Sequence, residues 1–393
     1  MISDKSPDFR FPISDFLISH WLRETDSAKL QSLWEQADAV RKNSVGDEVH
    51  LRGLIEISNL CRRQCLYCGI RAGNQKISRY RLTTEEVLHC ADLAVQFGYG
   101  SIVIQSGEDS AIATDWIAEI VERIKTTTNL AITLSLGERS ESDWKTWRSA
   151  GADRYLLRFE TSNEKLFRAI HPPNPEESAY RSRIEMLGDL QKIGYEVGGG
   201  IMVGIPGQTY NDLARDILLF KELRLDMVGL GPFLPHPHTP LGKLFPPAPQ
   251  TGLFRPTQWS QEQKTFFLRN GLEPPRLTDQ VCCDENFTFT VLALVRILCP
   301  TINLPSTTAV ATIDGKSGRK NGLSRGANVV MPNLTPTKYR EMYEIYPNKA
   351  AIYQTPEETH KQVMQHLHEI GRILGKRTGT SRNYELRTKD VHK

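Results

Sequence analysis

Three cysteines stand within eight residues of this chain and are its most distinctive chemical feature. The stretch 59–69 holds Cys61, Cys65 and Cys68, with Tyr67 immediately before the last of them. Soft thiolates at such a spacing bind an iron–sulfur cluster or zinc. Three protein ligands leave one iron of a four-iron cluster without a side chain, so that this iron can bind a small molecule. The spacing therefore predicts a cluster with one iron that is free to bind something other than the protein.

A structural zinc site is the alternative interpretation of the same cysteines. Structural zinc sites normally close with four ligands. After Cys68, however, no cysteine or histidine follows until His89. The pattern therefore favours an iron–sulfur cluster over zinc.

The segments around the cysteine loop predict a barrel of alternating strands and helices. Apolar residues alternate along 49–58, which leads directly into the cysteines. A capping box at Thr83–Glu86 predicts the start of the next helix. Further strands are predicted at residues 101–105, 131–136, 154–160, 197–203, 226–231, 302–308 and 328–331. Eight strands separated by helical segments predict an α/β fold, a complete (β/α)8 TIM barrel.

Three regions follow from this reading. Residues 1–48 form an N-terminal helical extension in which Asp26 caps a helix, residues 49–335 form the barrel, and residues 336–393 form C-terminal helices and a tail. A stretch at about 243–285, rich in Pro, Gln and Thr, predicts an irregular insertion in the barrel. The polar tail beyond Leu374 is expected to be disordered.

Polar residues recur where the predicted strands end, which is where barrel enzymes gather their active sites. The second strand ends in Gln105, Ser106, Gly107, Glu108 and Asp109. Gly107 allows close backbone approach, and the two acids can accept hydrogen bonds from an ammonium or a ribose.

The third and fourth strands add a second group of polar side chains. Thr133 and Ser135 are small hydroxyls that can line a ligand without crowding it. Arg158, Glu160 and Thr161 form an ion-rich cluster, which is costly to bury unless it is paired with a ligand or with itself.

Later segments are less informative from the residues alone. The glycines at 198–200 indicate either close backbone approach or a bend at a barrel corner. Met202 could pack on an adenine, although a core methionine is the commoner outcome. Thr307 and Thr308 end the seventh predicted strand. Arg183 lies on a helix and cannot be selected on these grounds.

Tyrosines and histidines near the end of the barrel have ordinary explanations. Tyr339, Tyr343 and Tyr346 could line a substrate cavity, but packing in helices is the commoner outcome. His236 and His238 lie in a Pro-rich stretch, which favours a rigid loop facing solvent over a metal site.

The composition excludes several classes of protein. Length alone fits either one large barrel or two domains. A net charge of +3 is too small to indicate a nucleic-acid track. No apolar run is long enough to span a membrane, and the N-terminus lacks a signal or transit pattern. Seven cysteines, three of them clustered, argue against a disulfide framework and favour a reducing cytoplasm.

Longer runs of the sequence resemble the radical S-adenosylmethionine (SAM) enzymes, and among them the HydE maturases of FeFe-hydrogenase. The likeness spans most of the chain, from the N-terminal helices to Tyr346. It is carried by residues 61–71, 105–109, 133–138, 151–161, 202–209, 227–237 and 326–332.

The resemblance implies a cofactor pair and a set of contacts. Cys61, Cys65 and Cys68 would hold one 4Fe–4S cluster, whose free iron is chelated by the amino and carboxylate groups of SAM. Arg183 would pair with the SAM carboxylate. The expected cofactor-binding residues are Tyr67, Gln105, Ser106, Gly107, Glu108, Ser135, Glu160, Arg183 and Met202. The expected substrate-side residues are Thr133, Arg158, Thr307, Thr308 and Tyr343.

The resemblance also implies a reaction. Reduction of the cluster would break a carbon–sulfur bond of SAM and give a 5'-deoxyadenosyl radical. In this family the radical is thought to act on the sulfur of a cysteine-bound iron carbonyl–cyanide unit. The implied substrate is a small organometallic or amino-acid-derived compound, and the implied partners are the maturases HydG and HydF, with no nucleic acid and no membrane.

Two departures from the family pattern stand out. Some members carry a second iron–sulfur cluster after the barrel, but residues 349–364 contain no cysteine, so one cluster is predicted. The insertion before the seventh predicted strand is also longer than expected. The enzymatic alternatives are a sulfur inserter resembling biotin synthase and a mutase resembling methylornithine synthase. The non-enzymatic alternative is an iron–sulfur redox-sensing scaffold.

Overall fold

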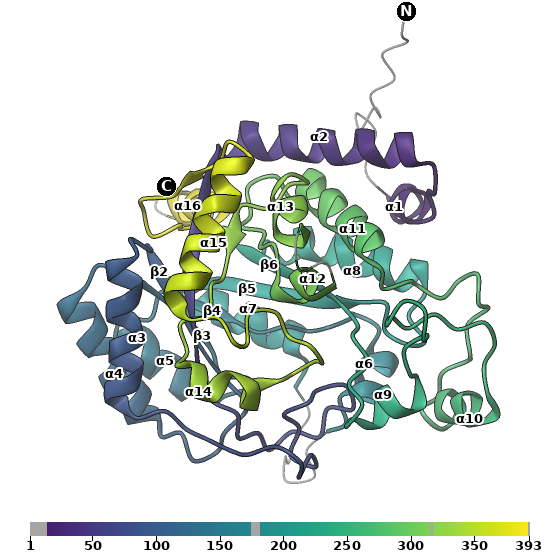
Figure 1. The fold of residues 1–393 in the computed structure, drawn as a ribbon, viewed down its shortest axis with the longest axis horizontal. Coiled ribbons are helices and arrows are strands. Elements are labelled where there is room, and N and C mark those ends of the chain that lie inside the picture. The colour runs from purple at the N-terminus through teal and green to yellow at the C-terminus, as the bar shows by residue number, and fades with distance from the viewer. Residues whose placement is uncertain (1–13, 174–180, 314, 316, 392–393) are drawn as a thin grey trace, which may run out of the picture.

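A parallel β-sheet surrounded by helices forms the body of the molecule (Figure 1). The structure, a computed structural model, describes residues 14–173, 181–313, 315 and 317–391. The strands lie in the order β6–β5–β4–β3–β2–β1–β7, and β8 pairs with the start of β1. All of these pairs are parallel, which confirms the α/β class. The strands are β1 Glu48–Ser58, β2 Ser101–Ser106, β3 Ala131–Ser135, β4 Arg154–Leu156, β5 Glu196–Val203, β6 Met227–Pro232, β7 Val329–Val330 and β8 Ile373–Leu374.

The predicted strand at 302–308 is not a continuous strand. Asn303 makes a single parallel bridge to Met227, and Pro305 makes another to Val329. Proline has no amide hydrogen for a sheet ladder, and helix α12 (Thr308–Ile313) already begins at the end of this segment. Among the described residues, the space between β6 and β7 is therefore spanned by two isolated bridges.

Helices cover the outer face of the sheet, and their starts follow local capping rules. Thr83 and Glu86 form the predicted capping box. Trp144, Trp147 and Tyr155 pack in the core between helices and sheet. The covering helices are α3 Thr84–Gln96, α4 Thr114–Thr127, α5 Glu141–Ser149, α6 Glu164–Ile170, α7 Arg183–Ile193, α8 Tyr210–Glu222 and α11 Glu285–Leu298.

The N-terminal helices lie at one end of the molecule. Helix α1 spans Asp15–Leu22 and α2 spans Ser27–Val45, with Asp26 accepting the first amides of α2 as predicted. In Figure 1, α2 (purple) crosses this end beside the yellow α16, whereas α9, α10 and α14 lie at the opposite end.

The insertion at 243–285 is more ordered than predicted. It contains helix α10 (Gln261–Arg269), which begins with a capping box formed by Ser260 and Gln263. The short helix α9 (Pro240–Leu244) precedes it. Four aromatic side chains pack into a small apolar core of their own: Phe245, Phe254, Trp259 and Phe267. The Pro-rich composition concealed this cluster, because its aromatic residues follow neither a helical nor a strand period in the sequence.

The segment after β7 returns over the sheet as short helices. They are α14 Thr337–Arg340, the 3-10 turn Glu341–Tyr343 and α15 Pro356–Glu369, whereas α13 (Gly318–Leu323) lies before β7. Thr355 caps α15 as predicted, with Pro356 in its first turn.

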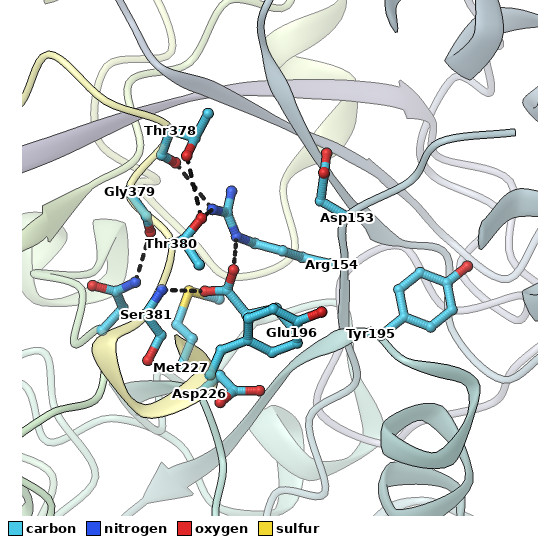
Figure 2. Close-up of polar contacts among 12 residues, drawn as sticks. Asp153, Arg154, Tyr195, Glu196, Asp226, Met227, Thr378, Gly379, Thr380 and Ser381 are labelled. Carbon is cyan, nitrogen blue, oxygen red and sulfur yellow. Dashed lines mark hydrogen bonds and ion pairs between the residues drawn. The ribbon is translucent and has the colours of Figure 1, made fainter. Parts of the chain in front are cut away.

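Residues 375–391 are ordered, contrary to the prediction, and they include α16 (Arg382–Val391). Figure 2 shows its residues 378–381 meeting the N-terminal ends of the strands. Glu196 accepts the Ser381 amide at 2.9 Å and pairs with Arg154 at 2.6 Å. The Gly379 carbonyl accepts from Arg52 and Asn303. Buried charged groups on the strands hold the tail in a fixed path. Its polar composition alone therefore wrongly indicated disorder.

Candidate active site

The cysteine loop follows β1 and is held by contacts with its own backbone and with distant segments. The Asn59 amide donates to the carbonyls of Ser78 and Met342, at 2.8 and 2.6 Å. Arg79 donates to four loop carbonyls, those of Asn59, Ile70, Arg71 and Asn74. At Gly107 a Cβ atom would collide with the Leu60 carbonyl. The predicted close approach therefore occurs against the cysteine loop.

All three clustered cysteines line one cavity of about 340 Å³ at the C-terminal ends of the strands. Burial raises the pKa of the Cys68 thiol to about 12, and it also raises the pKa values of Cys61 and Cys65. Thiolates at this place need a positive partner such as iron. Cys90, Cys282, Cys283 and Cys299 do not line this cavity.

The structure gathers nearly all of the predicted site residues around this cavity. Three residues are exceptions. Thr133 lies buried lower on β3, and its hydroxyl has no hydrogen-bond partner among the described residues. Asp109 pairs with Arg81 and Thr161 donates to Asp216, and neither lines the cavity. The predicted residues that line the cavity with the cysteines are Tyr67, Gln105, Ser106, Gly107, Glu108, Ser135, Arg158, Glu160, Arg183, Met202, Thr307, Thr308 and Tyr343.

Arg158 and Glu160 form an ion pair with each other beyond the C-terminal end of β4. The Arg158 guanidinium donates two bonds to the Glu160 carboxylate, at 3.0 and 2.9 Å, and a third to the Ile201 carbonyl. Glu160 has a φ of 60°, a left-handed conformation that costs a non-glycine residue roughly 1–3 kcal/mol. Strand β4 ends at Leu156, earlier than predicted, and Glu160 makes an isolated parallel bridge to Ile201.

Arg183 is the first residue of α7, and its side chain is buried in the cavity wall. Its guanidinium donates to Glu138 at 2.7 Å and to the Arg158 carbonyl at 2.8 Å, and it contacts His171 at 2.6 Å. Burial opposes its charge, but Glu138 and other negative groups raise the pKa of Arg183 above its usual value. The structure thus brings to the site a residue that the helical pattern alone did not select.

Four polar residues that the sequence reasoning missed also line the cavity: Glu56, Arg63, His171 and Lys349. Glu56 had a local signal, because it is a charged residue near the C-terminal end of β1, just before the cysteine loop. Lys349 had none, since it reaches the cavity from a loop after the sheet.

The comparisons with known proteins agree with this geometry. Residues 55–220 match the Radical SAM superfamily. The chain is 42% identical over 349 residues to the FeFe-hydrogenase maturase subunit HydE of Thermotoga maritima, covering 89% of this chain and 88% of that protein. The chain belongs to the radical SAM superfamily. It is an enzyme closely similar to HydE.

Two solved structures show that this radical SAM enzyme shares its fold with relatives of low sequence identity. Methylornithine synthase (PylB) superposes with a TM-score of 0.70 at 20% identity, covering 96% of this chain and 97% of that one. The maturase HydG superposes with a TM-score of 0.71 at 15% identity, covering 96% and 77%.

Membership of the radical SAM superfamily implies a 4Fe–4S cluster and SAM. The donor set fits the cluster, since three thiols and no other cysteine face one cavity. Within the described residues, no three Cys, His, Asp or Glu side chains are arranged around a single metal ion. That arrangement is not required, because each cysteine of a cluster binds a different iron.

The scaffold alternative is set aside, because the superfamily match and the HydE likeness make this chain an enzyme. None of the described helices combines the length and apolarity needed to cross a membrane.

Proposed function

We propose that this enzyme carries out the HydE reaction, in which SAM is cleaved to a radical that acts on a cysteine-bound iron carbonyl–cyanide precursor. The observation that carries the proposal is the single cavity into which Cys61, Cys65 and Cys68 project together with the predicted SAM and substrate residues. When bound, the reduced cluster would supply the electron that breaks SAM into methionine and a 5'-deoxyadenosyl radical.

The polar residues nearest the cysteines would hold SAM. Arg183 is positioned to receive a carboxylate, because a guanidinium offers a planar set of donors to two oxygens. Glu160 can accept from ribose hydroxyls, and Ser135 is a small hydroxyl close to the same wall. Met202 would pack on the adenine. Tyr67, Gln105, Ser106, Gly107 and Glu108 complete the proposed cofactor side.

The far wall of the cavity would hold the substrate. Arg158, Thr307, Thr308 and Tyr343 all line the cavity and are proposed for this side of it. Gln105 donates to the Tyr343 hydroxyl at 3.2 Å, which links the proposed cofactor and substrate sides. Thr133 is not brought to this wall and has no role in the proposal.

Several finer expectations belong to the same proposal. The chain would bind one cluster, because residues 349–364 contain no cysteine. Residues 49–335 would form the catalytic domain between an extension at 1–48 and C-terminal helices at 336–393. The two bridges at Asn303 and Pro305 favour closure of the sheet into a complete barrel. The lack of a membrane-spanning helix in the described residues is compatible with a cytoplasmic site.

The HydE likeness supports a place in FeFe-hydrogenase maturation. HydG and HydF are the proposed partners, and the proposed substrate is a small organometallic or amino-acid-derived compound. A biotin-synthase-like reaction is less well supported, because sulfur insertion of that kind needs a second cluster on barrel cysteines. The four remaining cysteines do not line the cavity.

Anaerobic reconstitution tests the proposal. The protein is loaded with iron and sulfide, reduced and mixed with SAM, and 5'-deoxyadenosine is measured with and without the iron precursor. We expect release of 5'-deoxyadenosine and consumption of the precursor. Cys65→Ala should lose the iron–sulfur absorbance and SAM cleavage, whereas Cys282→Ser, a cysteine outside the cavity, should retain both. Unchanged activity of Cys65→Ala would refute the assignment.

A further inference from the structure

Two glutamates stand between the cysteine loop and Arg183. Glu138 accepts from Arg183 Nε at 2.7 Å through one carboxylate oxygen and pairs with Arg63 Nη2 through the other. Glu108 pairs with Arg63 Nε at 2.5 Å. Arg63 lies between Cys61 and Cys65, so the chain of charges runs directly from the cluster ligands to Arg183.

The backbone is shaped to hold the two glutamates together. The Glu138 amide donates to Glu108 Oε1 at 3.1 Å. Gly137 has a φ of 75°, and a Cβ atom there would collide with the Glu108 side chain. Glycine at position 137 therefore allows Glu108 to lie against the backbone that presents Glu138.

His171 completes the surroundings of Arg183. Its Nε2 atom is 2.6 Å from Arg183 Nη2, and its ring stacks on Phe167 at 4.8 Å. Arginine can only donate, so His171 must accept through a neutral nitrogen. Burial, with the charge of Arg183, lowers the pKa of His171 well below its usual value, which agrees with a neutral ring.

The donors of Arg183 can be counted. Of its five N–H groups, Nε–H goes to Glu138, one on Nη1 goes to the Arg158 carbonyl and one on Nη2 goes to His171. Among the described residues, one N–H on each terminal nitrogen has no hydrogen-bond partner, apart from a longer 3.7 Å ion pair between Nη2 and Glu108. Two such groups match the two oxygens of a carboxylate.

We propose that Glu138 is a positioning residue that fixes Arg183 for the carboxylate of SAM and couples this arginine to the cluster loop through Arg63. The proposal rests on the proposed function, since it assumes that SAM binds here. Without the Glu138 charge, Arg63 and Arg183 would lose a buried anion that both contact, and Arg183 would lose the bond that sets the direction of its guanidinium.

The test compares SAM with decarboxylated SAM, which lacks the carboxylate, in the anaerobic holoenzyme. Glu138→Gln should retain its iron content but bind SAM at least tenfold more weakly, with a smaller SAM-induced change in the electron paramagnetic resonance spectrum of the reduced cluster. Its affinity for decarboxylated SAM should stay within about threefold of wild type. Glu141→Gln, an exposed glutamate three residues away that pairs with Lys145, is the matched control and should resemble wild type.

The possible outcomes distinguish a failure of the Glu138 proposal from a failure of the proposed function. Equal weakening of both ligands, or unchanged SAM affinity, would overturn the role of Glu138. Wild-type protein that binds no SAM would instead overturn the proposed function. Should Glu138→Gln fail to fold, His171→Leu gives an independent arm, because it also frees Arg183. It should weaken SAM binding and spare decarboxylated SAM, and the reverse result would contradict the proposal.

Discussion

Lys349 forms an ion pair with Glu56 inside the cavity, although 293 residues separate them in the sequence. The Lys349 ammonium also donates to the Tyr343 carbonyl at 3.2 Å, and Asn333 donates to the second oxygen of Glu56 at 2.9 Å. The Lys349–Glu56 ion pair therefore links the segment that follows the sheet to β1. The wall of the cavity is built from both ends of the chain.

Breaking this pair should destabilise the protein. Lys349→Met leaves the Glu56 carboxylate buried without its cation, which is expected to cost about 3–5 kcal/mol of unfolding free energy. Chemical denaturation under anaerobic conditions measures the loss. Combining Lys349→Met with Glu56→Gln should cost less than the sum of the two single changes, because the contact is shared. Strictly additive effects would mean that the two side chains do not interact.

Gly137 should be intolerant of a side chain for two separable reasons. Gly137→Ala places a side chain on a residue with an unfavourable left-handed conformation, and its Cβ atom also displaces Glu108. Gly98, just after α3, has a similar φ of 70° with open space around it, so Gly98→Ala reports the conformational cost alone, roughly 1–2 kcal/mol. We expect Gly137→Ala to be the more destabilising change and the only one to weaken SAM binding. Equal effects in both assays would show that Glu108 adjusts freely.

Asp226 should give the stability a measurable pH dependence. Burial raises its pKa from 3.8 to about 6, although Arg387 opposes the shift. The folded protein therefore binds this proton more tightly than the unfolded chain, and stability is lost as the pH rises from about 4 through 6. Asp226→Asn lacks this titration, so its stability relative to wild type should increase by about 3 kcal/mol between pH 4 and 7. Urea unfolding at several pH values measures the difference, and a constant difference would contradict the buried, titrating carboxyl.

Removing the tail should weaken the sheet from the end opposite the cysteines. A chain truncated after Leu374 leaves Arg52 and Glu196 without their tail partners. We expect a clear fall in the thermal midpoint, because buried charged groups lose hydrogen bonds. Lys376→Ala, which changes an exposed side chain of the tail, is the control and should leave the midpoint nearly unchanged. A full truncation as stable as wild type would mean that water replaces the tail without cost.

Much of the site could be predicted because its signals are local. The cysteine spacing, the alternation along β1 and the capping box at Thr83 each lie within a short stretch. Parallel strands bring their C-terminal ends to one edge, so residues after different strands, such as Gln105 and Arg158, could be expected to meet.

The rest depended on contacts that leave no local pattern. Arg183 resembles any surface arginine of a helix until Glu138 and His171 are placed around it. Lys349 reaches the cavity only through its distant partner on β1. The tail has a polar composition that usually indicates disorder, and only buried charges at the base of the strands give it a fixed path.

The ordered tail also determines where the enzyme can be attached to another protein or to a surface. Helix α16 lies beside α2, at the end of the molecule away from the insertion helices α9 and α10 (Figure 1). A fusion partner joined after α16 would therefore be attached at the end opposite those helices. Enzyme attached to an electrode or a bead through this terminus would keep the opening of the cavity exposed to solution. The cofactor, the reductant and partner proteins could then reach it.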